Sequence, residues 1–242
     1  MAGPRIDIVT IFPELVEHFL KGSLLGLARR DGIVEVRTTD LRAYATDRQR
    51  SVDDEPFGGG DGMVLKCEPV VAAVEALAAP GARIFCLGPR GRIFDQALAE
   101  ELVEAPQLVL LCGRYAGFDE RICEETGAEE LSLGDYVISG GEAAALVVTE
   151  AVTRLVPGVV GNPASPRADS FSEGLLEHPI YTRPREFRGR RVPEPLLSGN
   201  HAQIERFRRE ESLRLTRERR PELLEVAQLS EEDRKFLEEL ER

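Results

Sequence analysis

Short apolar segments alternate with helix-like segments over the first two thirds of the chain, and this alternation restricts the fold more than any other feature of the sequence. Segments rich in β-branched residues predict strands, and apolar residues that recur every three or four positions predict helices. The expected strands cover 5–12, 33–38, 83–87 and 108–112, with an extended segment at 129–138. The expected helices cover 68–79, 95–104, 119–126 and 142–155, and an earlier one runs through Leu15, Phe19, Leu24 and Leu27 to Gly32. Such alternation predicts an α/β fold whose mostly parallel sheet is covered by helices.

The character of the sequence changes at Pro157. Residues 157–174 are rich in Pro, Gly, Ser and Asn, as in a linker or a lid, and 175–199 look irregular. Asn200 can cap a helix over 201–219, and Ser230 with Asp233 can start a last helix. We therefore predict an α/β domain at 1–160, a linker or lid at 161–174 and a small helical domain at 175–242.

Composition limits the class of protein. Hydrophobic residues make up 42% of the chain, enough for a core, and no apolar run approaches the ~20 residues that cross a bilayer. The N-terminal residues lack the pattern of a signal peptide. We expect a cytoplasmic protein with no membrane partner. The cysteines form no C-x-x-C pair and the three histidines are scattered, which predicts reduced thiols and no structural metal.

The net charge of −12 argues against a nucleic-acid partner, but the charge is unevenly distributed. Residues 183–220 contain 12 arginines and 6 glutamates. A basic segment can neutralise phosphates on an otherwise acidic protein. A solvated helix of mixed charge explains the same segment, and the charge pattern by itself does not decide between the two.

Glycine-rich turns follow three of the later strand segments. No G-x-G-x-x-G turn follows the first strand and no GxxxxGK[ST] loop occurs, so the common nucleotide-binding motifs are missing. The turns are LGPRG at 87–91, CGRYAG at 112–117 and LGDYVISGG at 133–141. Ligands of open α/β sheets bind at the carboxyl ends of strands, so the three turns can form one pocket. Each turn can also serve only to reverse the chain.

Several longer motifs carry a family resemblance. They are SVDDEPFGGGDGM at 51–63, CGRYAGFDER at 112–121, LSLGDYVISGGE at 131–142, DSFSEGLLEHPIYTRP at 169–184 and VPEPLLSGNHAQIERFR at 192–208. In this order they resemble the tRNA (guanine-N1)-methyltransferases of the knotted SPOUT class, of the bacterial TrmD type, over essentially the whole chain.

The resemblance implies a deep trefoil knot and a homodimer with active sites shared between subunits. It also implies that S-adenosylmethionine is held bent within the knot. The residues that would bind this cofactor are Leu87, Gly88, Pro89, Gly91, Gly113, Tyr115, Gly117, Leu133, Gly134, Asp135, Tyr136, Val137, Ile138, Gly140 and Gly141.

The implied reaction is methylation of guanine N1 in the nucleotide directly 3′ of the anticodon, position 37. N1 becomes a good nucleophile only after it loses its proton, which a carboxylate can accept. Asp169 matches the family's proposed base. Arg154, from the other subunit, matches the arginine that stabilises negative charge on O6. By itself, Asp169 would be read as a solvated loop charge and Arg154 as a residue that satisfies a helix C-terminus.

The implied RNA partner is the tRNA anticodon stem-loop. Its contacts would come from Asp53, Asp54, Gly58, Gly59, Gly60, Ser165 and Arg183, with arginines of 183–220 on the stem phosphates. The chain departs from the family pattern at Ala116, where glutamate is common, which puts a carboxylate's role there in doubt. Family enzymes are also reported to use magnesium, but no ligand cluster in this sequence defines a site.

Two alternatives remain at this level. A relative in the same fold class could methylate a ribose 2′-oxygen or an rRNA base. A protein that has kept the fold could also bind RNA without catalysing a reaction.

Overall fold

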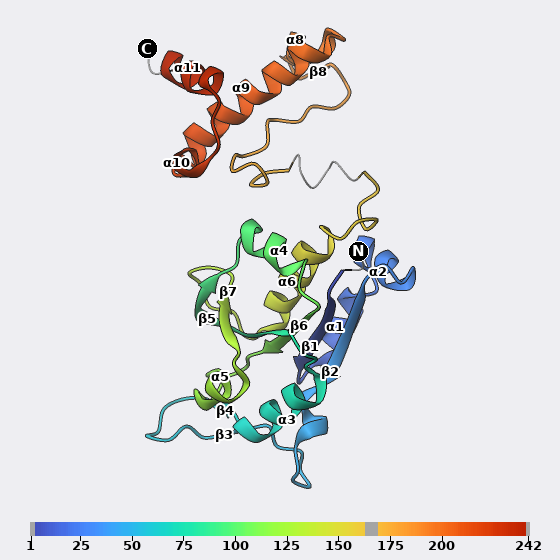
Figure 1. Cartoon of the computed structure of the whole chain (residues 1–242), viewed down its shortest axis with the longest axis vertical. Coiled ribbons are helices and arrows are strands. Elements are labelled where there is room, and N and C mark those ends of the chain that lie inside the picture. Colours follow the sequence, from blue (N-terminus) through green and yellow to red (C-terminus); the bar gives the residue numbers. More distant parts are fainter. Residues whose placement is uncertain (1–2, 163–168, 241–242) are drawn as a thin grey trace. The chain divides into compact units, whose positions relative to one another are not determined.

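The computed structural model describes residues 3–162 and 169–240 and divides the chain into two compact units, Met1–Pro163 and Ala164–Arg242 (Figure 1). Each unit is described by itself below. Within the described residues, no helix combines the length and the apolar character that crossing a membrane requires.

Unit 1 is built on a five-stranded sheet in the order β2-β1-β6-β5-β7, and every neighbouring pair is parallel. The strands are β1 (Arg5–Thr10), β2 (Glu35–Asp40), β5 (Arg83–Ile93), β6 (Gln107–Cys112) and β7 (Glu129–Ser132). This confirms the predicted α/β class with a parallel sheet. The knot that the resemblance implies stays a prediction.

Helices cover both faces of the sheet (Figure 1). One face packs against α1 (Pro13–Phe19), α2 (Ser23–Arg30), α4 (Gln96–Leu102) and α6 (Glu142–Thr153). The other packs against the 3-10 turn η1 (Leu41–Tyr44), α3 (Cys67–Leu77) and α5 (Arg121–Thr126). A two-stranded ladder, β3 (Asp53–Asp54) with β4 (Val64–Leu65), lies outside the main sheet.

The central strand β6 shows why the sequence forms this layered structure. All six of its residues are buried. Leu108 and Leu110 belong to the core on one face, and Val109 and Leu111 belong to the core on the other. Successive side chains of a strand point to opposite faces, so a strand covered on both sides is mainly apolar. The polar exception in β6, Gln107, donates its side-chain amide to Asp7 at 2.7 Å.

The helical pattern predicted through Leu15 to Gly32 forms two helices, α1 and α2, with a break near Gly22. Gly22 donates its N–H to the carbonyl of Phe19 at 3.0 Å, which closes a turn between them. The residues that fixed the prediction, Leu15, Phe19, Leu24 and Leu27, are 44–54% exposed, whereas Val16, Leu20, Leu25 and Ala28 are buried. The periodicity predicted helix correctly. The side chains that face the core, however, are those of the neighbouring helix face, which carries Val16, Leu20, Leu25 and Ala28.

Two other segments differ from their predicted extent. Strand β5 continues to Ile93, because it pairs with β7 a second time after an interruption: Leu87 and Arg92 both pair with Leu131. The chain from Gly88 to Gly91 therefore bulges out of the strand. The extended segment predicted at 129–138 is a strand only to Ser132, and a turn follows.

In the part that the structure describes, 169–240, unit 2 is a small helical unit with one short ladder. Its elements are β8 (Glu186–Phe187), β9 (Arg190–Arg191), α8 (Glu194–Leu197), α9 (His201–Arg219), α10 (Leu223–Val226) and α11 (Glu231–Glu239). Asn200 caps α9 by accepting the N–H of Gln203, and Ser230 with Asp233 forms a capping box on α11, as the sequence predicts.

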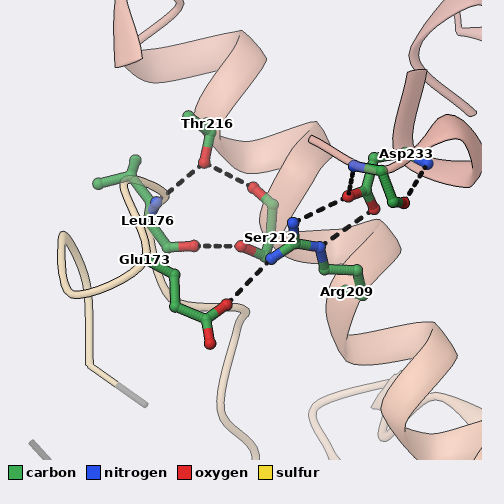
Figure 2. A network of polar contacts seen from close by, with 7 residues as sticks. Glu173, Leu176, Arg209, Ser212, Thr216 and Asp233 are labelled. Atoms are coloured by element: carbon green, nitrogen blue, oxygen red, sulfur yellow. Dashed lines mark hydrogen bonds and ion pairs between the residues drawn. The ribbon is translucent and has the colours of Figure 1, made fainter. Parts of the chain in front are cut away.

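Few apolar side chains are buried in unit 2. A polar network connects its segments instead (Figure 2). Arg209 on α9 donates to both carboxylate oxygens of Asp233, at 3.1 and 2.9 Å. On the same helix, Ser212 donates to the carbonyl of Leu176, and Thr216 accepts that residue's N–H at 2.9 Å. The backbone N–H and carbonyl of Leu176 thereby attach the segment around this residue to α9.

Candidate active site

A cavity of about 360 Å³ lies at the carboxyl ends of β6 and β7 and beside the bulge of β5. This is the edge of a parallel sheet at which α/β proteins bind ligands. Its lining comes from the three glycine-rich turns and adjoining residues: Leu87–Arg90, Gly113–Phe118, Glu130–Gly134, Tyr136–Gly141 and Ala144. The three turns meet at one site, as the sequence predicts.

The first wall is the bulge of β5. Gly88 has no atom within 4 Å of the position that a Cβ would take, so its backbone lies open. Gly91 closes the bulge, and a Cβ there would clash with the backbone of Glu130 and Leu131. Glycine is therefore required at 91 for the strand to resume its pairing. Gly91 itself is not among the residues that line the cavity.

The second wall follows β6 and turns sharply at Tyr115, whose φ of +59° is unusual for a residue with a side chain. Gly117 donates its N–H to the carbonyl of Arg114 at 2.9 Å and closes the turn. A Cβ on Gly113 would lie 2.9 Å from the Phe118 ring. Tyr115 is 56% exposed beside the cavity, where a flat ligand could contact its ring.

The third wall, from Leu133 to Gly141, is joined to the second. Gly141 donates its N–H to the carbonyl of Gly113 at 2.7 Å, and Gly140 forms an antiparallel bridge with Arg114. A Cβ on Gly141 would lie 2.8 Å from Cα of Cys112, so the two turns can approach only through glycine. Asp135, which the resemblance includes among the cofactor contacts, does not line the cavity.

Beneath these turns lies a polar cluster of Thr10, Arg114 and Glu142. The Glu142 carboxylate accepts from the Thr10 hydroxyl at 2.6 Å and from Arg114 Nε at 3.1 Å, and its second oxygen lies 2.8 Å from Arg114 Nη2. Arg114 also donates to the carbonyl of Ser139 at 3.3 Å and stacks on the Phe12 ring, 4.5 Å from its centre. The cluster connects β1, the second turn and the start of α6.

Charged neighbours change the pKa of several groups around the cavity. Hydrogen bonds to Glu120 and Glu130 raise the pKa of Arg90 on the first wall. The Arg121 guanidinium holds the pKa of Asp119 well below its usual range. Burial, together with Asp119, raises the pKa of Cys67 to about 11, and burial also raises the pKa of the Cys112 thiol. The thiols beside the site are therefore protonated and unreactive near neutral pH.

The long loop between β3 and β4 follows Asp53 and Asp54, two of the predicted RNA contacts, which form β3. Its far end contacts the second turn, because Met63 accepts the N–H of Ala116 and Leu65 donates to the carbonyl of Gly117, both at 2.9 Å. Gly58, Gly59 and Gly60 all have positive φ and open space around them. None of these predicted RNA contacts lines the cavity.

The predicted catalytic residues lie in different units. Arg154 is the C-cap of α6 in unit 1, where its N–H donates to the carbonyl of Glu150 at 3.1 Å. Asp169 is partly buried in unit 2, and its carbonyl accepts the N–H of Ser172 at 3.4 Å. Ser165 lies outside the described residues. The catalytic roles and the shared site stay predictions.

Arg183 lines a second cavity, of about 500 Å³, within unit 2. Two further arginines, Arg185 and Arg208, line it together with His178 and Tyr181. Arginine and aromatic side chains are the groups that bind phosphates and stack on unpaired bases.

Sequence reasoning did not single out several residues that line or support the main cavity. Arg90, Arg114, Phe118, Glu130 and Ser132 belong to its wall, and Glu142 and Thr10 support it. Most of these lie within or beside the glycine turns, whose position is a signal that could have found them. Thr10 could not be found in this way, since it is distant in sequence. Among the described residues, no group of three or more His, Cys, Asp or Glu could hold a metal ion.

The parallel sheet and the cavity at its carboxyl edge define an α/β domain of the class that binds small ligands at this edge. The chain belongs to the tRNA (guanine-1)-methyltransferase TrmD family, whose model matches residues 4–226. The tRNA (guanine-N(1)-)-methyltransferase of Moorella thermoacetica is 52% identical to it, and the match covers 98% of this chain and 97% of that protein. The proteins of the same name from Geobacter metallireducens and Geobacillus kaustophilus are each 50% identical, with 98% of both chains covered.

These comparisons confirm the resemblance found in the sequence and identify the chain as an enzyme of this family. They do not favour a methyltransferase for another RNA site, and an RNA-binding module without activity does not fit the family.

Proposed function

We propose that this protein transfers the methyl group of S-adenosylmethionine to N1 of the guanosine at tRNA position 37. Membership of the family over residues 4–226 supports the reaction. The observation that carries it to this molecule is that three glycine turns surround one cavity at the carboxyl edge of the sheet. Because the substrate is tRNA, the proposal places the reaction in the cytoplasm.

The residues of the cavity fit such a cofactor. Its volume lies in the range of small-molecule sites, about 300 to 1,000 Å³. The open backbone of Gly88 and Gly117 can approach a flat ring, and the third turn, Leu133 to Gly141, would hold the adenine through backbone groups. The cofactor supplies a methyl group already activated on a sulfonium, so the protein has mainly to align it with N1.

Asp169 and Arg154 would carry the chemical step. The Asp169 carboxylate takes the proton from N1, a contribution of about 10²- to 10⁴-fold. Negative charge then develops on O6, and the Arg154 guanidinium of a second copy stabilises it. N1 forms its bond to the methyl carbon as the carbon–sulfur bond breaks.

The proposal includes a homodimer, because the two residues would come from different copies. The apolar side chains that α1 and α2 expose support it: Leu15, Phe19, Leu24 and Leu27 are 44–54% exposed in the single chain. Leu15 and Phe19 lie about one turn apart on α1, as do Leu24 and Leu27 on α2, and neighbouring exposed apolar side chains are a feature of protein–protein interfaces.

Unit 2 and the β3–β4 loop would bind the anticodon stem-loop. The cavity around Arg183, Arg185 and Arg208 offers guanidinium groups for phosphates. Asp53, Asp54 and Gly58–Gly60 would approach the target base and its neighbour, which leave the stack to be read. Ser165 would complete these contacts.

Mass spectrometry of tRNA treated with the purified protein and S-adenosylmethionine tests the proposal. We expect 1-methylguanosine at position 37. A methyl group on a ribose oxygen, or at another position, would overturn the assignment. Because no magnesium site is defined, the assay is run both with magnesium and with a chelator.

A further inference from the structure

Arg114 places a positive charge in the wall of the cavity. Its side chain is 18% exposed, and it lines the space that the three turns enclose. The inference below rests on the proposed function, in which this cavity binds a positively charged sulfonium. An unneutralised guanidinium would repel that ligand, because like charges destabilise each other most where water is largely excluded.

Glu142 neutralises this charge from below. Its side chain is only 5% exposed and forms the ion pair with Arg114 Nη2 at 2.8 Å. The hydroxyl of Thr10, at 2.6 Å, holds the carboxylate in place from β1. A Cβ on Gly140 would lie 2.6 Å from Glu142 Oε2, so the third turn leaves just enough room for the pair.

The second arginine of the wall is paired in the same way. Arg90 lies 2.8 Å from Glu120 and 2.6 Å from Glu130. Both arginines that line the cavity are therefore matched by carboxylates. The pair at Arg114 differs because it is the buried one, and solvent screens it less.

We propose that Glu142 determines which form of the cofactor the cavity prefers. By cancelling the charge of Arg114, it lets the cavity accept S-adenosylmethionine, whose sulfonium is positive, rather than favour S-adenosylhomocysteine, whose sulfur is neutral. Glu142 acts through Arg114 and is a positioning and specificity-determining residue.

The test is calorimetric titration of the full chain with each ligand in the absence of tRNA. Glu142→Gln keeps an oxygen that can accept from Thr10 but removes the negative charge. We expect the affinity for S-adenosylmethionine to fall roughly 10-fold relative to that for S-adenosylhomocysteine, from one added charge at short range in a partly screened site. Arg114→Gln should change the ratio in the opposite direction, and the double variant should restore it to within about twofold.

A matched control is Asp7→Asn. Asp7 is also a buried carboxylate in an ion pair, with Arg5 at 2.7 Å, but it lies toward the other end of β1. It should leave the ratio of the two affinities unchanged. Equal weakening of both ligands in Glu142→Gln, or an unchanged ratio in Arg114→Gln, would overturn the inference. Wild-type protein that binds neither ligand would instead overturn the proposed function.

Discussion

The backbone N–H of Ala116 donates to the carbonyl oxygen of Met63 at 2.9 Å, and this bond joins the β3–β4 loop to the cavity wall. The loop carries predicted RNA contacts and the wall carries predicted cofactor contacts. The segment predicted to read the base is thus attached to the turn predicted to hold the methyl donor. Residue 116 is also where this chain departs from the family pattern.

Ala116→Glu should strengthen cofactor binding. The side chain of Ala116 is exposed and lines the cavity, so a carboxylate there would attract a cofactor that carries a positive sulfonium. We expect about a 2- to 10-fold gain in affinity for S-adenosylmethionine at low salt, because one exposed charge is partly screened. Calorimetry measures it, and Ala116→Gln, which adds the bulk without the charge, is the control. A gain of the same size in the control would exclude electrostatic attraction.

Gly140→Ala should prevent the third turn from packing against Arg114 of the second turn. A Cβ at this position would clash with Arg114 Nε and lie 2.6 Å from Glu142 Oε2, so the ion pair would be displaced. We expect cofactor affinity to fall at least about 10-fold, since a site displaced by a fraction of an ångström loses much of its binding energy. Gly161→Ala is the control, because no atom lies within 4 Å of its Cβ position. Equal affinities of the two variants would contradict this account of the turn.

Asp169→Ala should slow the chemical step without weakening cofactor binding. Removal of a general base costs about 10²- to 10⁴-fold in rate. Single-turnover methylation of tRNA measures that loss, and titration with S-adenosylhomocysteine measures the affinity. Glu173→Ala, an exposed carboxylate nearby in the same unit, is the control and should keep its rate. A near wild-type rate in Asp169→Ala would remove this residue from the mechanism.

Mixed dimers test whether two copies share one site. Arg154→Ala alone and Asp169→Ala alone should each lose most of their activity, because each site lacks one of the two groups. Mixing the two variants should restore one complete site in each mixed dimer, so activity should return to roughly a quarter of the wild-type level per protein after random exchange. No recovery, with exchange confirmed by mass spectrometry, would argue that each site lies within one chain.

Asp233→Asn should destabilise unit 2 in a pH-dependent way. Hydrogen bonds from Arg209 hold the pKa of Asp233 below its usual value, so the folded state favours the ionised form. The stabilisation is present above the unfolded-state pKa of about 4 and is lost as the pH falls through the lower folded-state value. We expect a cost of about 1–3 kcal/mol at pH 7. The cost should be smaller at pH 2.

Chemical denaturation followed by a probe in unit 2 measures this difference. Glu232→Gln, an exposed carboxylate in the same first turn of α11, should cost much less. If the cost of Asp233→Asn were the same at pH 7 and pH 2, the ion pair would not be its cause.

The sequence by itself determined the class of the fold and which three turns line the main cavity. The apolar run of β6 has to be covered on both faces, and strands that alternate with helices pair in parallel. Glycine turns after successive parallel strands necessarily reach the same edge of the sheet. The motifs also identified the family, because they occur in order over almost the whole chain.

Only the tertiary structure decided which side chains meet. Thr10 and Glu142 are 132 residues apart, and no local pattern shows that their side chains lie 2.6 Å from each other. The buried stripe of α1 and α2 also depends on where the sheet lies, since both neighbouring stripes are apolar. Local periodicity predicts whether a segment is a helix or a strand. Packing against the rest of the chain decides which face of the element is buried and which residues it contacts.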